Sequence, residues 1–179
     1  MRQFLITIVT LLFLSCNSKF EVDKNLSKDS LFTLAAIADS TKELDRSIAY
    51  YSRILEIDST DLTALVNRGR ALLTKKKTSL GLADYDKALK LYPDAEVYAT
   101  KGMALLTIND TKNAFANFSI AAMLDSNCSN AYYGYSLVKL SHKQYKYALS
   151  WCNKADSIRY DSGLSSLIHA KLKEEGYIK

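Results

Sequence analysis

Proline and glycine are both scarce in this chain of 179 residues, which has one proline and six glycines. These two residues interrupt helices and form most of the tight turns in β proteins. The sequence also lacks any usable stretch in which polar and apolar residues alternate, the pattern typical of a half-buried strand. Hydrophobic residues make up 48% of the chain, enough to bury the core of one domain. We therefore expect an all-α protein.

Residues that carry chemistry are few as well. The two histidines, His142 and His169, are too far apart in the sequence to suggest a metal site, and we interpret each as a surface residue. Of the three cysteines, Cys128 falls in a predicted loop and Cys152 at a predicted core position, so we expect no disulfide between them. No phosphate-binding loop, nucleophile elbow or catalytic carboxylate pair occurs in the sequence. The sequence predicts no enzymatic activity, no cofactor and no metal site.

The net charge of +5 comes from lysines scattered along the chain. The densest cluster, Lys75–Lys77, is predicted to lie in a turn between two helices. Aromatic and basic residues do not alternate on a shared surface, as they do in many nucleic-acid-binding proteins. The cluster is interpreted as a solvated turn, and neither a nucleic acid nor a small-molecule substrate is indicated.

The chain repeats a pattern about 34 residues long, which is clearest between Ala95 and Cys128. In this copy a first helix is followed by a turn at Asn109-Asp110 and then by a second helix. Small residues, Gly102 and Ala121, stand where the two helices would approach most closely. The bulky and small residues that define the pattern are Tyr98, Gly102, Leu105, Ala114, Phe118 and Ala121.

Shifting this pattern by one period locates three further copies, which gives four in all: 28–61, 62–94, 95–128 and 129–162. The phase slips once, by a single residue, near Pro93. Two departures stand out. Arg68 and Lys101 occupy an apolar position, and we interpret them as long stems whose charges reach water. Gly81 replaces an alanine, which is expected to weaken its helix by about 1 kcal/mol.

These four units resemble tetratricopeptide repeats. The resemblance implies an α-solenoid in which each repeat buries its apolar face against its neighbours. After the fourth repeat, Leu164, Leu167, Ile168 and Leu172 share one face of a further helix. Residues 163–179 are therefore predicted to form a capping helix and tail that cover the end of the solenoid.

The N-terminus is similar to a bacterial lipoprotein signal. Arg2 precedes an apolar run, Phe4–Leu14, that is too short to span a bilayer. The residues Phe13-Leu14-Ser15-Cys16 match a lipobox, so residues 1–15 would be the signal peptide and Cys16 the lipidated residue. Residues 16–27 are then expected to tether the domain to a membrane of a bacterial cell envelope. Of the envelope membranes, the outer membrane is the one expected. An ordinary secretory leader with an incidental cysteine is the alternative.

In proteins that this chain resembles, the first helices of successive repeats line a concave groove that binds a peptide or protein. The resemblance implies a partner-binding groove lined by Phe32, Val66, Asn67, Arg70, Met103, Leu106, Tyr133 and Leu137. The alternative is that part of this lining belongs to the buried core. For Phe32 and Tyr133 the groove and the core are equally favoured, whereas for Leu73 and Leu106 the core is favoured. Thr33, Glu96 and Thr100 do not fit the basic clamp that some such proteins use to grip chaperone tails.

The function expected from these features is a membrane-anchored scaffold or assembly factor that binds another protein. Two alternatives remain open. The chain could be an accessory subunit of an envelope enzyme or uptake complex, or it could associate with itself as a structural protein. The residues do not identify the partner.

Overall fold

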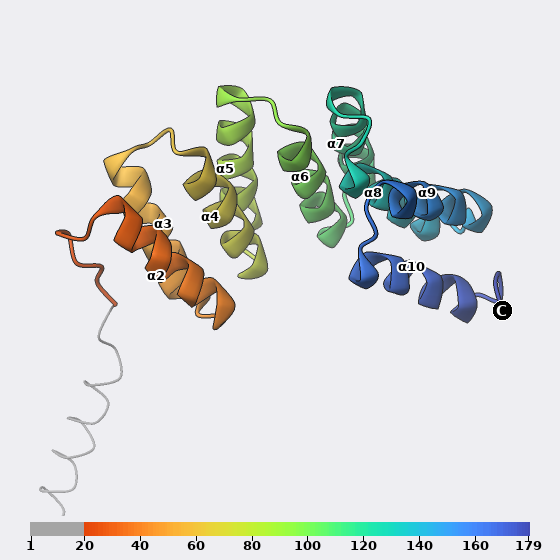
Figure 1. Cartoon of the computed structure of the whole chain (residues 1–179), viewed down its shortest axis with the longest axis horizontal. Coiled ribbons are helices and arrows are strands. Elements are labelled where there is room, and N and C mark those ends of the chain that lie inside the picture. Colours follow the sequence, from red (N-terminus) through yellow and green to blue (C-terminus); the bar gives the residue numbers. More distant parts are fainter. Residues whose placement is uncertain (1–19) are drawn as a thin grey trace, which may run out of the picture.

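The computed structural model describes residues 20–179, and all of the regular structure in that part of the chain is helical (Figure 1). The prediction of an all-α solenoid is confirmed. The predicted signal peptide and Cys16 lie outside the described residues. The helices are α2 (Lys28–Ser40), α3 (Leu44–Ile57), α4 (Leu62–Thr74), α5 (Thr78–Leu91), α6 (Ala95–Thr107), α7 (Thr111–Leu124), α8 (Ser129–Ser141), α9 (Tyr145–Ile158) and α10 (Ser162–Glu174).

Consecutive helices pack in pairs, α2 with α3, α4 with α5, α6 with α7 and α8 with α9, and the pairs follow one another in a row (Figure 1). The last helix, α10, packs on both α8 and α9. Ile168 and Leu172 of α10 are fully buried in a cluster that also contains Ala148 and Ala155. This helix therefore covers the apolar end of the fourth pair.

Local sequence signals begin and end these helices. Carboxylates cap α4, α6 and α10: Asp61, Asp94 and Asp161 each accept hydrogen bonds from backbone N–H groups in the first turn. Inside each pair, one turn residue has a left-handed backbone, and these residues are Lys42, Lys76, Asn109 and Lys143, with φ between 57 and 61°. The next residue then donates its N–H to a carbonyl in the last turn of the first helix. The cluster Lys75–Lys77 is thus the turn that its place in the repeat predicts.

Small residues allow the paired helices to approach closely. A Cβ atom added to Gly81 would lie 2.7 Å from the carbonyl oxygen of Gly69 and 2.7 Å from Cγ of Leu73. Alanine would not fit there, so the expectation that Gly81 merely weakens its helix was incomplete: the closest contact between α4 and α5 requires it.

The interpretation of Arg68 as a stem with its charge in water was wrong. Its guanidinium donates two hydrogen bonds to the Asp84 carboxylate, at 2.8 and 2.7 Å, across the contact between α4 and α5. A third hydrogen bond, of 3.2 Å, reaches Oγ of Ser52 on α3. Asp84 is only 9% exposed, so this ion pair lies within the contact between the two helices of the second repeat, and the bond to Ser52 links it to the first repeat. Lys101 likewise pairs with Asp86, at 2.5 Å.

The described part of the predicted tether is packed against the domain. The Phe20 ring lies 5.4 Å from that of Tyr50 on α3, and the Arg46 guanidinium stands 5.2 Å from the Phe20 centroid. Val22 and Leu26 pack against the first core cluster. The described part of the predicted tether, residues 20–27, therefore lies against the first core cluster and α3 instead of extending away from the domain.

Candidate functional site

The junction between α5 and α6 is more open than the junctions before and after it. Helix α5 contacts α6 more sparsely than α3 contacts α4 or α7 contacts α8. The connection here, Tyr92–Asp94, has three residues, whereas Asp58–Asp61 and Asp125–Cys128 have four. Two hollows follow one another along α4 at this junction.

The larger hollow, here called the Arg70 hollow, has a volume of about 640 Å³. Its apolar walls come from Leu73 of α4, Tyr85 of α5 and Met103 of α6. Its cations are Arg70 and Lys76, and none of the described residues that line it is acidic. The remaining lining residues are Thr74, Thr78, Thr100, Ala104, Thr107 and Ile108. This arrangement suits a ligand with an apolar side chain and a nearby negative charge.

Arg70 is held at the edge of this hollow by a network on α2 and α3. The Asp39 carboxylate accepts hydrogen bonds from the hydroxyls of Ser47 and Tyr51 and lies 3.6 Å from the Arg70 guanidinium. Burial, with the Asp39 hydrogen bond, raises the pKa of Tyr51. The Arg70 side chain remains 59% exposed, so most of its hydrogen-bonding groups are available to a ligand.

The smaller hollow, here called the Val66 hollow, has a volume of about 380 Å³ and lies toward the N-terminal ends of α4 and α6. Val66 and Asn67 of α4 face Val97 of α6 across it, and Tyr92 of the short connection also lines it. Tyr92 is 60% exposed. This hollow offers an amide and an aromatic ring beside the cationic one.

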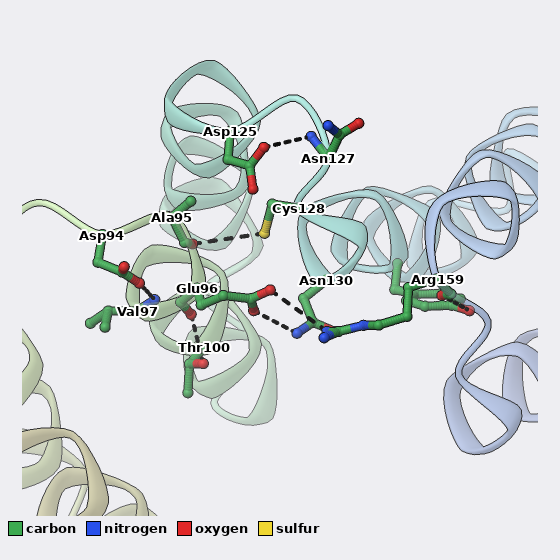
Figure 2. Close-up of polar contacts among 11 residues, drawn as sticks. Asp94, Ala95, Glu96, Val97, Thr100, Asp125, Asn127, Cys128, Asn130 and Arg159 are labelled. Carbon is green, nitrogen blue, oxygen red and sulfur yellow. Dashed lines mark hydrogen bonds and ion pairs between the residues drawn. The ribbon is translucent and has the colours of Figure 1, made fainter. Parts of the chain in front are cut away.

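On the other side of α6, by contrast, polar contacts tie the third and fourth repeats together (Figure 2). The Glu96 carboxylate accepts a hydrogen bond of 2.7 Å from the Asn130 side chain on α8 and lies 3.6 Å from the Arg159 guanidinium. Cys128, which is buried, contacts the Ala95 carbonyl through its sulfur at 3.9 Å. The third repeat is therefore joined to its two neighbours differently: Glu96 binds both Asn130 and Arg159 on the side of the fourth repeat, whereas the Lys101–Asp86 ion pair crosses the more sparsely packed α5–α6 junction.

The structure brings together four of the residues predicted for the groove. Val66 and Asn67 line one hollow, and Arg70 and Met103 line the other. Phe32, Leu106 and Leu137 are half-buried against separate core clusters. Their apolar faces contribute mainly to packing.

The placement of Tyr133 in an open groove was wrong. This side chain has no exposed surface, and its hydroxyl donates to Asp156 at 2.5 Å and accepts from the backbone N–H of Asp161 at 2.8 Å. Burial, together with the Asp156 hydrogen bond, raises the pKa of Tyr133 to about 12. The start of the capping helix covers the position that would otherwise face the groove.

One polar cluster was missed by the sequence analysis. Cys152 and Asp156 of α9 meet Ser165 and His169 of α10, which corrects the interpretation of His169 as an isolated surface residue. Cys152 is buried, as its repeat position predicts. The signal was two pairs of residues with helical i, i+4 spacing, 152/156 and 165/169, on helices that were themselves predicted.

Within the described part of the chain, no helix combines the length and the apolar character needed to cross a bilayer.

The sequence model of the family described as tetratricopeptide repeat matches residues 29–61 and 62–94. A curated relative, the protein STIP1 homolog of Dictyostelium discoideum, is 26% identical over 98 residues. That match covers 50% of this chain but only 17% of the relative, so the chain spans about a sixth of the relative's length.

Solved structures share the fold. A structure of pilF from Pseudomonas aeruginosa is 20% identical with a TM-score of 0.71, over 86% of this chain and 71% of that one. MamA from Desulfovibrio magneticus RS-1 is 18% identical with a TM-score of 0.65, over 88% and 89% of the two chains. The chain contains tetratricopeptide repeats, and its described part is an all-α solenoid built from them.

Proposed function

We propose that this chain is a protein-interaction scaffold that binds a partner segment at the α5–α6 junction, with the Arg70 hollow as the principal contact. The tetratricopeptide fold supports a scaffold in general. The observation that carries the specific proposal is the Arg70 hollow at the sparsely packed α5–α6 junction, where apolar side chains from three helices and two cations line the same space.

The chemistry of the hollow indicates the chemistry of the segment. Leu73, Tyr85 and Met103 can bury one apolar side chain of the partner, and methionine adapts its shape to different occupants. Arg70 can then donate two hydrogen bonds to a carboxylate on the same segment. The partner segment is therefore amphipathic and acidic, bound as a helix or as an extended strand of peptide.

The experiment places a photocrosslinking amino acid at Thr100, inside the hollow, and in a second protein at Lys87, which is exposed on α5. A partner that crosslinks from Thr100 but not from Lys87 is purified and titrated against the native chain. In the variant Arg70→Glu/Met103→Glu, affinity should fall at least about tenfold, because an acidic segment meets a reversed charge.

The matched control is Lys87→Glu/Met123→Glu, which makes the same changes of charge at exposed positions outside both hollows. Circular dichroism shows whether each variant is folded. Equal loss of affinity in the control, or unchanged affinity in the variant, would place the partner elsewhere and reject the hollow as the site. The expectation that the chain is not an enzyme stays a prediction.

The second part of the proposal is a lipid anchor at Cys16 in a bacterial envelope. It is supported by the apolar run Phe4–Leu14 and the lipobox residues that follow it. Because Phe20 is packed on α3, the anchor would hold the solenoid by that end, with little free chain between lipid and domain. Cys16→Ala should release the protein from the membrane fraction or leave it unprocessed, whereas Cys128→Ser should not. Unchanged mature mass and attachment in Cys16→Ala would reject the anchor.

A further inference from the structure

The contact between α9 and the capping helix α10 contains a group of side chains that could bind a metal ion. Cys152, Asp156 and His169 offer a sulfur, a carboxylate oxygen and an imidazole nitrogen that all lie within 4.8 Å of one another. We propose that these three residues form a zinc site that fixes α10 to the end of the solenoid.

The separations suit zinc. The Cys152 sulfur lies 3.9 Å from Oδ2 of Asp156 and 3.9 Å from Nδ1 of His169. Two ligands of one tetrahedral zinc ion, with a Zn–S bond of about 2.3 Å and a Zn–N bond of about 2.0 Å, stand about 3.5 Å apart. Shifts of a few tenths of an ångström would bring the sulfur to the ideal separation from each of the other two ligand atoms, while the Asp156 oxygen and the His169 nitrogen, within 4.8 Å of one another, would approach as the imidazole turns from the Ser165 carbonyl. Thiolate, imidazole and carboxylate are also the three ligand types that zinc takes in proteins.

The carboxylate is already oriented by a neighbouring residue. The Tyr133 hydroxyl donates to Oδ1 of Asp156 at 2.5 Å and is itself fixed by the N–H of Asp161. This leaves Oδ2 on the side of the sulfur. Support of this kind for a ligating carboxylate is usual in zinc sites, because it fixes the direction of the metal-binding oxygen.

The charges balance. A thiolate and a carboxylate together neutralise Zn²⁺, which allows the ion to sit in a contact where Cys152 has no exposed surface. Asp156 and His169 are only half-buried, so the site is accessible to an ion from solvent. Three protein ligands leave the fourth position to a water molecule.

Binding would rearrange two hydrogen bonds and release one proton. His169 Nδ1 now donates to the Ser165 carbonyl at 2.8 Å, so its proton moves to Nε2 when Nδ1 binds zinc. The Ser165 hydroxyl, which lies 3.0 Å from Oδ2 of Asp156, turns to another acceptor. Cys152 binds zinc as the thiolate, so its thiol proton is released to solvent on binding.

The test uses the full chain, treated with a chelator and dialysed, and measures zinc bound per chain by mass spectrometry under native conditions. The native protein should bind one zinc ion. At zinc one hundred times the dissociation constant, the thermal midpoint should rise by about 5 to 11 °C. Cobalt bound at the same site should show the near-ultraviolet absorption of a thiolate ligand.

Cys152→Ser and His169→Gln should each weaken zinc binding by at least about tenfold, and Cys152→Ser should also abolish the cobalt–thiolate band. The matched controls are Cys128→Ser, at the other buried cysteine of the described chain, and His142→Gln, at the exposed histidine. They should bind zinc as the native protein does. Absence of stoichiometric zinc binding, equal binding in Cys152→Ser, or a cobalt complex without thiolate absorption would each overturn the proposal. The native protein's cobalt spectrum decides the matter even if a variant fails to fold.

Discussion

Gly134→Ala tests whether the stability of the solenoid depends on the close packing of glycines around the Phe118 ring. Phe118 of α7 has no exposed surface and lies between two glycines, Gly102 on α6 and Gly134 on α8. A Cβ atom at Gly134 would stand 2.3 Å from Cε1 of the ring, and one at Gly102 would stand 2.5 Å from the same atom. The ring cannot retreat from one helix without pressing on the other.

Two effects of this substitution compete. Alanine in place of glycine should stabilise the helix by about 1 kcal/mol through its higher helix propensity. Relieving an overlap of more than an ångström in a packed core should cost about 3 kcal/mol. The net effect is a loss of about 2 kcal/mol, which in a chain of this size corresponds to a fall in the thermal midpoint of about 4 to 8 °C.

The assay is thermal unfolding followed by circular dichroism, with two companion variants. Gly163→Ala is the control, because an added Cβ in α10 would meet only a flexible Asp161 oxygen, at 3.3 Å, and the midpoint should stay the same or rise. In Gly134→Ala/Phe118→Leu the smaller side chain makes room, so the double variant should be more stable than the sum of its single changes predicts. A Gly134→Ala protein as stable as the native chain would refute the argument.

Three further outcomes are expected. Arg68→Met should lower the free energy of unfolding by about 2 kcal/mol, because it leaves the nearly buried Asp84 carboxylate unpaired; Arg68→Met/Asp84→Asn should recover part of this loss, and additive losses in chemical denaturation would contradict the pairing. Burial raises the pKa of Tyr85 from its usual value near 10 to about 12. The folded state therefore keeps a proton that the unfolded state loses, and stability should decline as the pH rises from about 10 to 12, less steeply in Tyr85→Phe. Phe20→Ala should speed tryptic cleavage after Lys24 several-fold, because the segment loses its contacts with Tyr50 and Arg46; Tyr160→Ala, at an exposed ring, should cleave as the native chain does.

The helices could be predicted because residues within each repeat mark where its helices begin and end. A carboxylate before α4 and before α6, a left-handed turn residue inside each pair, and small residues at fixed spacing are all local signals. Their physical effects act within a few residues, as in the cap that Asp94 provides for α6. Local signals of this kind can be recognised in one repeat without knowing how the neighbouring repeats pack against it.

What the sequence did not predict depends on partners from other helices. Arg68 fits the description of a solvated stem until Asp84 is placed opposite it. Gly81 was taken as a weak helix former, although the backbone of Gly69 leaves no room for a larger residue. A periodic pattern tells which face of a helix a residue occupies, but it does not tell what stands against that face.

Tyr133 shows the same limit at the candidate site. Its position in the repeat corresponds to positions that line the hollows in earlier repeats, such as Val66. In the fourth repeat the following connection, Arg159–Asp161, brings a backbone N–H onto its hydroxyl, and the capping helix encloses the ring. A capping element therefore changes the role of a residue that the repeat pattern treats as equivalent.

The length of the connections explains where the open junction lies. The one-residue slip near Pro93 that the sequence shows is the three-residue connection before α6 in the structure. The other three-residue connection, before α10, also precedes a helix that contacts its predecessor sparsely, whereas the two four-residue connections lead to close contacts. At α10, the sparse contact with α9 is supplemented by hydrogen bonds in the polar cluster of Asp156, Ser165 and His169. At α6, the Lys101–Asp86 ion pair crosses the junction, but threonines and apolar side chains line the hollow beside it, and this is the junction at which we propose that a partner binds.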